Sequence, residues 1–127
     1  MRAPDSTRLF AYGTLRRGAP MHRLIEHATR FLGPASFAGR LFDLGDYPAV
    51  TDGGGRRDVV YGELYELMAE GREQLLDSID RYEGRSFERV RREVTCQDGT
   101  VVVAFLYLFR GDLASARRVR SGDYLGA

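Results

Sequence analysis

Glu83 is the residue whose position in the sequence points most clearly to chemistry. The segment 70–83 repeats apolar residues at helical spacing, and at about 100° per residue Glu83 falls in one stripe with Leu75, Leu76, Ile79 and Tyr82. A carboxylate facing the core loses solvation and also feels the negative end of the helix dipole, and both effects raise its pKa. A raised pKa suits a general base near neutral pH. The alternative is that Glu83 lies in a frayed last turn and points to solvent.

A second candidate for chemistry is a short turn near the N-terminus. The apolar run 9–12 ends at Gly13, which Thr14 and Leu15 follow. A glycine at the end of a buried strand lets main-chain N–H groups converge on a cleft, where they can bind an anion or a developing oxyanion. Strands also end in Gly-Thr for turn reasons alone, so the simpler interpretation stays open.

The residues that usually bind metals or act as nucleophiles are sparse. His22 and His27 are the only histidines, and their spacing of five does not put them on one helix face as a metal pair requires. Cys96 is the only cysteine and has no obvious partner base. The sequence therefore predicts no metal site and no cofactor.

Charged residues near these candidates have simpler interpretations. Asp77 and Asp80 lie on the opposite or flanking side of the same predicted helix, so we expect solvated surface charges. Arg16 and Arg17 follow the Gly13 turn and either meet a substrate carboxylate at the mouth of a pocket or stay in solvent.

The elements that must position these residues follow from periodicity and turn signals. Helices are expected over 20–30 and 70–83, the second ending at Gly84. Strands are expected over 9–12, 36–44, 59–67, 87–96 and 100–109, the last two joined by an Asp-Gly hairpin turn. The glycine-rich stretch 51–58 is predicted to be a mobile connection. The predicted order is β-α-β-β-α-β-β.

Length and composition limit the class of protein. The 127 residues fit one domain, 1–127, with a core over about 7–112 and a partly ordered tail over 113–127. The net charge of +1 and the scatter of all 19 arginines argue against a nucleic-acid partner. The longest apolar run, 101–109, is too short to cross a membrane as a helix. With one cysteine and no secretory signal pattern, a cytoplasmic location is expected.

Several short motifs also occur in a fixed order along the chain. They are Tyr12-Gly13-Thr14-Leu15-Arg16-Arg17-Gly18, Leu44-Gly45-Asp46-Tyr47-Pro48-Ala49 and Tyr61-Gly62-Glu63-Leu64-Tyr65. Further along come Ile79-Asp80-Arg81-Tyr82-Glu83-Gly84, Phe87-Glu88-Arg89, the strand 104–107 and Ser121-Gly122-Asp123-Tyr124. Together they resemble the γ-glutamylcyclotransferase-like family over nearly the whole chain.

The resemblance implies an α+β fold, a small mixed β-barrel with flanking helices. It also implies that Glu83 is the catalytic acid/base and that the substrate contacts Tyr12, Gly13, Thr14, Leu15, Tyr47, Pro48, Phe87 and Tyr107. Two residues depart from the common pattern: Phe87 stands where tyrosine is common and Tyr124 where tryptophan is common. Either departure alters the pocket without removing Glu83.

The function that the resemblance implies is an intramolecular acyl transfer, of the transferase or lyase type. The α-amino group of a small γ-glutamyl amine or peptide attacks its own γ-carbonyl, forms 5-oxoproline and releases the amine, so no external nucleophile is needed. The alternative is a non-catalytic module that holds such a ligand in the same pocket. A pure protein-interaction domain would need an exposed apolar stripe, which the sequence lacks. Neither the leaving amine nor the oligomeric state can be read from it.

Overall fold

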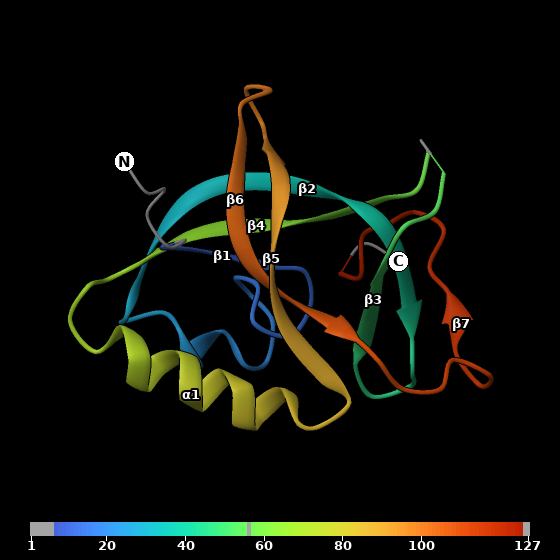
Figure 1. Cartoon of the computed structure of the whole chain (residues 1–127), viewed down its shortest axis with the longest axis horizontal. Coiled ribbons are helices and arrows are strands. Elements are labelled where there is room, and N and C mark those ends of the chain that lie inside the picture. The colour runs from blue at the N-terminus through green and yellow to red at the C-terminus, as the bar shows by residue number, and fades with distance from the viewer. Residues whose placement is uncertain (1–6, 56, 126–127) are drawn as a thin grey trace.

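A computed structural model describes residues 7–55 and 57–125 of the protein, and Figure 1 shows their arrangement. The strands are β1 (Arg8–Ala11), β2 (Thr29–Asp43), β3 (Pro48–Asp52), β4 (Val59–Leu67), β5 (Phe87–Cys96), β6 (Val101–Phe109) and β7 (Arg117–Arg118). The helical elements are a 3₁₀ turn, η1 (His22–Leu24), and the α-helix α1 (Arg72–Glu83). No helix in the described part of the chain is long and apolar enough to cross a membrane.

Five strands close into a barrel. The sheet runs β2-β4-β1-β6-β5, and β5 pairs again with β2 through Ala35 and Cys96. The pairing of β1 with β6 is parallel, whereas β1 pairs with β4 antiparallel, so the barrel is mixed. The predicted α+β barrel fold is therefore confirmed.

Alternation along the strands divides the core into two apolar clusters. In β1, Phe10 belongs to one cluster, whereas Leu9 and Ala11 belong to the other. In β6, Leu106 lies in the first and Tyr107 in the second. The second cluster also contains the buried residues of the helix, Leu75, Leu76 and Ile79. Each such side chain stabilises the docking of α1 on the barrel by roughly 1.5–3 kcal/mol.

The helix α1 lies across one end of the strands, and the β5–β6 hairpin projects away from it (Figure 1). The helix α1 is capped at its C-terminal end by Gly84, whose φ of 85° is in the left-handed region that favours glycine. The N–H of Gly84 donates to the carbonyl oxygen of Asp80. The predicted helix end is thus confirmed. This end places the last residue of α1 beside β1.

The predicted helix over 20–30 is wrong. The segment forms only η1 and adjoining turns, with hydrogen bonds such as Ile25 N–H to His22 C=O, and β2 already begins at Thr29. The apolar residues at helical spacing do pack under α1, but pairing of Thr29 with β4 and a bond from Met21 N–H to Thr14 C=O hold the chain in a tighter path. Tertiary contacts therefore override the local pattern.

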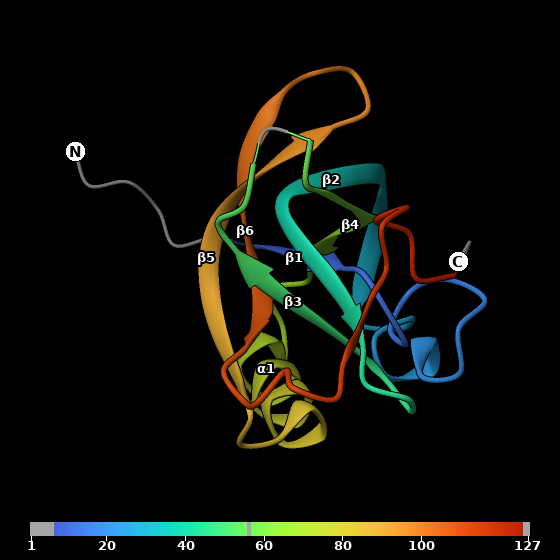
Figure 2. The ribbon, with the colours of Figure 1, turned by 90° about the vertical axis from the view of Figure 1, so that its right-hand side faces the viewer.

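The order of strands also differs from the prediction. A strand over 48–52, β3, was not predicted, and it pairs with the end of β2. In the glycine-rich stretch 51–58, the described residues that follow β3 (53–55, 57 and 58) form no helix or strand. The predicted tail contributes the two-residue strand β7, which pairs with β2. Val119 is buried in the first cluster, so the core extends beyond residue 112. Figure 2 shows this C-terminal segment beside the loop that follows β1.

Candidate active site

A cavity of about 260 Å³ lies between the end of β1, the end of α1 and the loop that precedes β3. Glu83 and the eight predicted substrate-binding residues all line it. Four further residues complete the wall: Phe10, Ala11, Asp46 and Tyr82. The volume is close to the lower end of the range for small-molecule sites, about 300–1,000 Å³. The fold thus brings together residues that are up to about a hundred positions apart in sequence, and their roles toward a substrate stay predictions.

Glu83 is the last residue of α1 and is half-buried at the cavity wall. Burial raises the pKa of its carboxyl from the ordinary 4.5 to about 7, because the charged form loses water. No described residue forms an ion pair or hydrogen bond with its side chain. The carboxylate is therefore both poised near neutral pH and available to a ligand.

Two buried tyrosines stand beside Glu83. The hydroxyl of Tyr12 donates to the carbonyl oxygen of Tyr107 at 2.6 Å, and the hydroxyl of Tyr107 donates to Oδ1 of Asp80 at 2.6 Å. Burial is the main cause that raises the pKa of both hydroxyls, and the charge of Glu83 adds to it, so all three groups are close together. Both tyrosines therefore stay protonated and form a rigid wall.

Asp80 is partly exposed, as predicted for a surface charge, with 39% of its side chain accessible to solvent, but the prediction missed its partners. Besides accepting the bond from Tyr107, its Oδ1 lies 3.7 Å from Nε of Arg89 on β5. Asp80 thus connects α1 to two strands of the barrel. Asp77, the other aspartate of this prediction, is exposed as expected.

Residues 12–18 form a loop that we call the cradle loop, and its first four residues line the cavity. A Cβ atom on Gly13 would lie 2.3 Å from Cγ of Pro48, so only glycine fits there without displacing the proline. The turn is closed by a bond of 3.0 Å from Arg16 N–H to Gly13 C=O. No acceptor among the described residues bonds the main-chain N–H groups of Gly13, Thr14 or Leu15. These donors are therefore available to an anionic oxygen.

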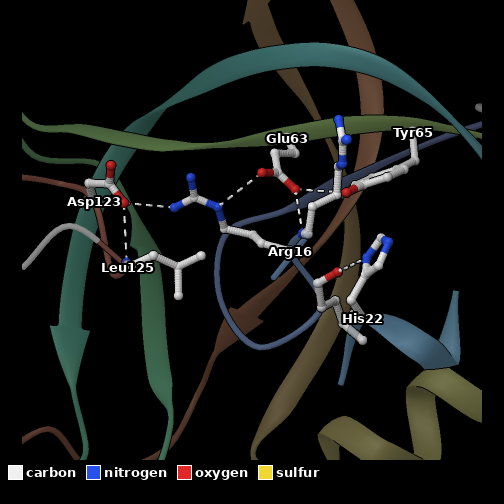
Figure 3. A network of polar contacts seen from close by, with 8 residues as sticks. Arg16, His22, Glu63, Tyr65, Asp123 and Leu125 are labelled. Carbon is white, nitrogen blue, oxygen red and sulfur yellow. Dashed lines mark hydrogen bonds and ion pairs between the residues drawn. The ribbon is translucent and has the colours of Figure 1, made fainter. Parts of the chain in front are cut away.

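The cradle loop is tied down by a polar network (Figure 3). Nη1 of Arg16 donates to Oδ1 of Asp123 at 2.7 Å, and Nε of Arg16 lies 3.7 Å from Oε2 of Glu63 on β4. Glu63 also accepts bonds from the N–H of Arg17 and the hydroxyl of Tyr65. The side chains of Arg16 and Glu63 are only 13% and 15% exposed, so solvent screens this pair weakly.

Further bonds fix the two ends of the loop. Nδ1 of His22 lies 2.9 Å from the carbonyl oxygen of Leu15. The hydroxyl of Tyr82 lies 2.5 Å from Oγ1 of Thr14, which joins the loop to the end of α1. The cradle loop is therefore held from β4, α1, η1 and the C-terminal segment together.

Comparison with known proteins decides the family. The family described as gamma-glutamyl cyclotransferase, AIG2-like, matches residues 9–126. The chain belongs to this family. The predicted resemblance is confirmed, and the γ-glutamyl cyclotransferase family is a family of enzymes.

Named relatives come from distant organisms. The chain is 33% identical to gamma-L-glutamyl-butirosin B gamma-glutamyl cyclotransferase of Niallia circulans over 110 residues, which are 82% of this chain and 67% of that protein. It is 33% identical to a gamma-glutamylaminecyclotransferase of Bos taurus over 101 residues, 70% of this chain and 56% of that protein. The crystal structure of an uncharacterized protein from Pyrococcus horikoshii superposes with a TM-score of 0.69 and 29% identity, covering 94% of this chain and 90% of that one.

In this cyclotransferase-family member, the other residues singled out in the sequence lie away from the cavity. Arg16 and Arg17 do not line it, because Arg16 turns toward Glu63 and Asp123 while the guanidinium of Arg17 stacks on Phe31. Arg16 is held inside the protein, so both alternatives, contact with a substrate at the mouth of the pocket and exposure to solvent, are wrong for this residue. His22 bonds the cradle loop, His27 is exposed, and no group of three or more potential ligands in the described ranges is placed to hold a metal.

Four residues of the cavity were not among the predicted site residues, and two of these four, Tyr82 and Asp46, have polar side chains. Tyr82 was assigned to the apolar stripe of the helix, but 38% of it is exposed and its hydroxyl reaches Thr14. Asp46 lies inside one of the quoted motifs, yet nothing in its spacing indicated that it would line a cavity. Its signal was its place directly before Tyr47 and Pro48, two of the predicted residues.

Proposed function

We propose that this protein cyclises the γ-glutamyl group of a γ-glutamyl amine or peptide to 5-oxoproline and releases the amine. The observation that carries the proposal is the pairing, in one cavity, of a half-buried carboxyl with a pKa of about 7 and a loop of unbonded main-chain N–H groups. The first suits proton transfer and the second suits a developing oxyanion. Membership of the family supports γ-glutamyl compounds as the class of substrate for this site.

The proposed reaction begins with the α-ammonium group of the substrate. The Glu83 carboxylate takes a proton from it, and the freed α-amine attacks the γ-carbonyl carbon to close a five-membered ring. The carbonyl oxygen becomes an oxyanion that the N–H groups of Gly13, Thr14 and Leu15 stabilise. Protein side chains supply no nucleophile, because the substrate carries its own.

Collapse of the tetrahedral intermediate completes the cycle. The C–N bond to the amine breaks as Glu83 returns its proton to the leaving nitrogen, so the enzyme ends in the state in which it began. Two protons leave the α-nitrogen in all: Glu83 passes one to the leaving nitrogen, and the ring nitrogen loses the second as the lactam forms, to the released amine or to solvent. The lactam keeps the carbonyl oxygen. A carboxyl whose pKa lies close to neutral pH serves both as base and as acid.

The shape of the cavity supports a fixed orientation of the substrate. The rigid wall of Tyr12 and Tyr107 and the close contact of Gly13 with Pro48 fix the shape of its inner end. Holding the amine and carbonyl of one molecule in a near-attack arrangement removes much of the entropic barrier to ring closure. The inner end therefore suits the γ-glutamyl part, which all such substrates share.

The test is a screen of γ-glutamyl compounds for release of 5-oxoproline, measured by mass spectrometry with purified protein. Wild type is expected to release 5-oxoproline and the free amine in equal amounts. Binding of these compounds in a calorimeter without any 5-oxoproline would instead support the non-catalytic alternative, in which the same cavity only holds the ligand.

A further inference from the structure

Asp46 is a carboxylate at the outer end of the cavity that has no arginine partner. The other aspartates that the structure describes in the first half of the chain each have one: Nη2 of Arg117, Arg92 and Arg118 lies 3.1, 3.1 and 2.6 Å from Asp43, Asp52 and Asp58. No described residue forms an ion pair with Asp46. In a protein with 19 arginines, Asp46 is therefore a second carboxyl group at the cavity, besides Glu83, that no described arginine neutralises.

Exposed aromatic rings stand beside this charge. Tyr47 is 43% exposed and Tyr82 38% exposed, and both line the cavity. The ring of Tyr47 rests on Phe87 with centroids 5.9 Å apart, so one of its sides stays open. Aromatic faces attract cations as well as apolar chains. We call residues 44–47 the rim loop.

The charges of the cavity wall have one sign. Its lining residues include the carboxyls of Asp46 and Glu83, and neither arginine nor histidine is among those that the described part of the chain contributes. Asp43, three residues before Asp46, is neutralised by Arg117 rather than by a group that reaches the cavity. A negatively charged portion of a ligand at the outer end would therefore meet repulsion without compensation.

We propose that the rim loop selects γ-glutamyl substrates whose leaving amine carries a further positive charge, with Asp46 as the specificity-determining residue. The inference rests on the proposed function. The nitrogen of the leaving amine must reach Glu83, and the γ-glutamyl part fills the inner end by the cradle loop. The remainder of the amine then extends outward, past Tyr47 and Tyr82, to the carboxylate of Asp46.

The test uses three amides of γ-glutamate that differ only in the end of a four-carbon chain. The amines are 1,4-diaminobutane, butylamine and 4-aminobutanoate, which place a positive, a neutral and a negative group at the same distance. The ratio of kcat/KM between the first and the second is expected to be about fivefold, and between the second and the third again about fivefold, as for partly screened charges. Both ratios shrink at about 1 M salt.

The Asp46→Asn variant is expected to bring the ratio of the positive to the neutral amide close to one. Asp77→Asn is the matched control, because it makes the same change of net charge at an exposed position of α1 that does not line the cavity. It is expected to keep the wild-type ratios. Equal kcat/KM for the three amides in wild type, or unchanged ratios in Asp46→Asn, would overturn the role of Asp46.

Affinities measured by calorimetry on Glu83→Gln separate this proposal from the proposed function. An ordered affinity for the three amides, with no 5-oxoproline from wild type, keeps the rim proposal and overturns catalysis. Release of 5-oxoproline from all three amides at the same rate keeps the proposed catalysis and overturns the rim proposal. Absence of both binding and release overturns both.

Discussion

The cradle loop and the rim loop face the same cavity but are held in different ways. The cradle loop, residues 12–18, is bonded from β4, α1, η1 and the C-terminal segment, with Arg16 between Glu63 and Asp123 at its centre. The rim loop, residues 44–47, is held by local bonds, from Leu44 N–H to Tyr47 C=O and from Gly45 N–H to Asp43. Long-range bonds fix the first, whereas a turn of the chain defines the second.

This difference suggests a division of labour between the two loops. Changing one residue of the cradle loop disturbs several segments, so the loop suits the constant part of a substrate. The exposed side chain of Asp46 can change without loss of a core contact, so the rim loop suits the variable part. Substitutions that alter one loop and spare the other test this division.

The largest effect is expected from Glu83→Gln, at the helix end that faces the cradle loop. Removing the titrating group while keeping the shape should lower kcat for 5-oxoproline release by about a hundredfold or more, with ligand binding retained. Glu73→Gln is the matched control, because Glu73 is an exposed glutamate in the first turn of the same helix. A folded Glu83→Gln within threefold of wild type would show that Glu83 is not the base.

Gly13→Val should lower kcat/KM about tenfold to a hundredfold for all substrates alike. Its Cβ would enter the space of Pro48, at 2.3 Å from Cγ, and must push the cradle loop and β3 apart. Gly55→Val is the control, since its nearest neighbour to an added Cβ is the Asp58 carboxylate at 3.7 Å. Wild-type kcat/KM in folded Gly13→Val would remove the cradle loop from the mechanism.

Glu83 should also make stability depend on pH. Its pKa rises from 4.5 to about 7 on folding, so the folded state binds more protons between these values and stability falls as pH rises through this window. Glu83→Gln has no such group and keeps its stability. The unfolding free energy of the variant minus that of wild type should therefore increase by about 1–3 kcal/mol between pH 5 and pH 8. Urea unfolding measures it. A gain that does not change with pH would contradict burial as the cause of the shift.

A smaller effect is expected from Asp123→Asn, which weakens the hold on Arg16. The cradle loop loses one of its anchors, so kcat/KM should fall about fivefold, by the same factor for the positive, neutral and negative amides. Asp123→Glu should restore part of the activity, and Asp112→Asn, at an exposed turn, serves as the control. A loss that depends on the charge of the amine would place Asp123 with the rim loop instead.

Much of the fold was predictable because the relevant signals are local. Strand β4 and the first strand of the hairpin, β5, have the predicted bounds, and α1 ends at Gly84 as its φ requires. The helix expected over 20–30 failed because its apolar spacing reflects packing under α1, while the backbone is directed by the pairing of Thr29 with β4. Local periodicity reports which side of a segment is buried and does not report which long-range bonds compete for its backbone.

The same distinction applies to the candidate site. The placement of Glu83 follows from the helical stripe of Leu75, Leu76 and Ile79, so its burial was accessible from spacing. The network of Arg16, Glu63 and Asp123 joins segments about 50 and 60 residues apart and has no local pattern. The partners of Asp80 were missed for this reason too, since Tyr107 and Arg89 belong to strands that come later in the chain.

The pH dependence of kcat/KM for 5-oxoproline release tests the central claim most directly. If Glu83 must lose a proton before it can accept one from the substrate, activity below about pH 8 should rise with pH and reach half of its maximum near 7, the pKa that burial gives this carboxyl. Glu83→Gln should lack this inflection while keeping its fold. A wild-type profile with its midpoint near 4.5, or the same inflection near 7 in Glu83→Gln, would contradict the assignment of Glu83 as the proton-transfer group.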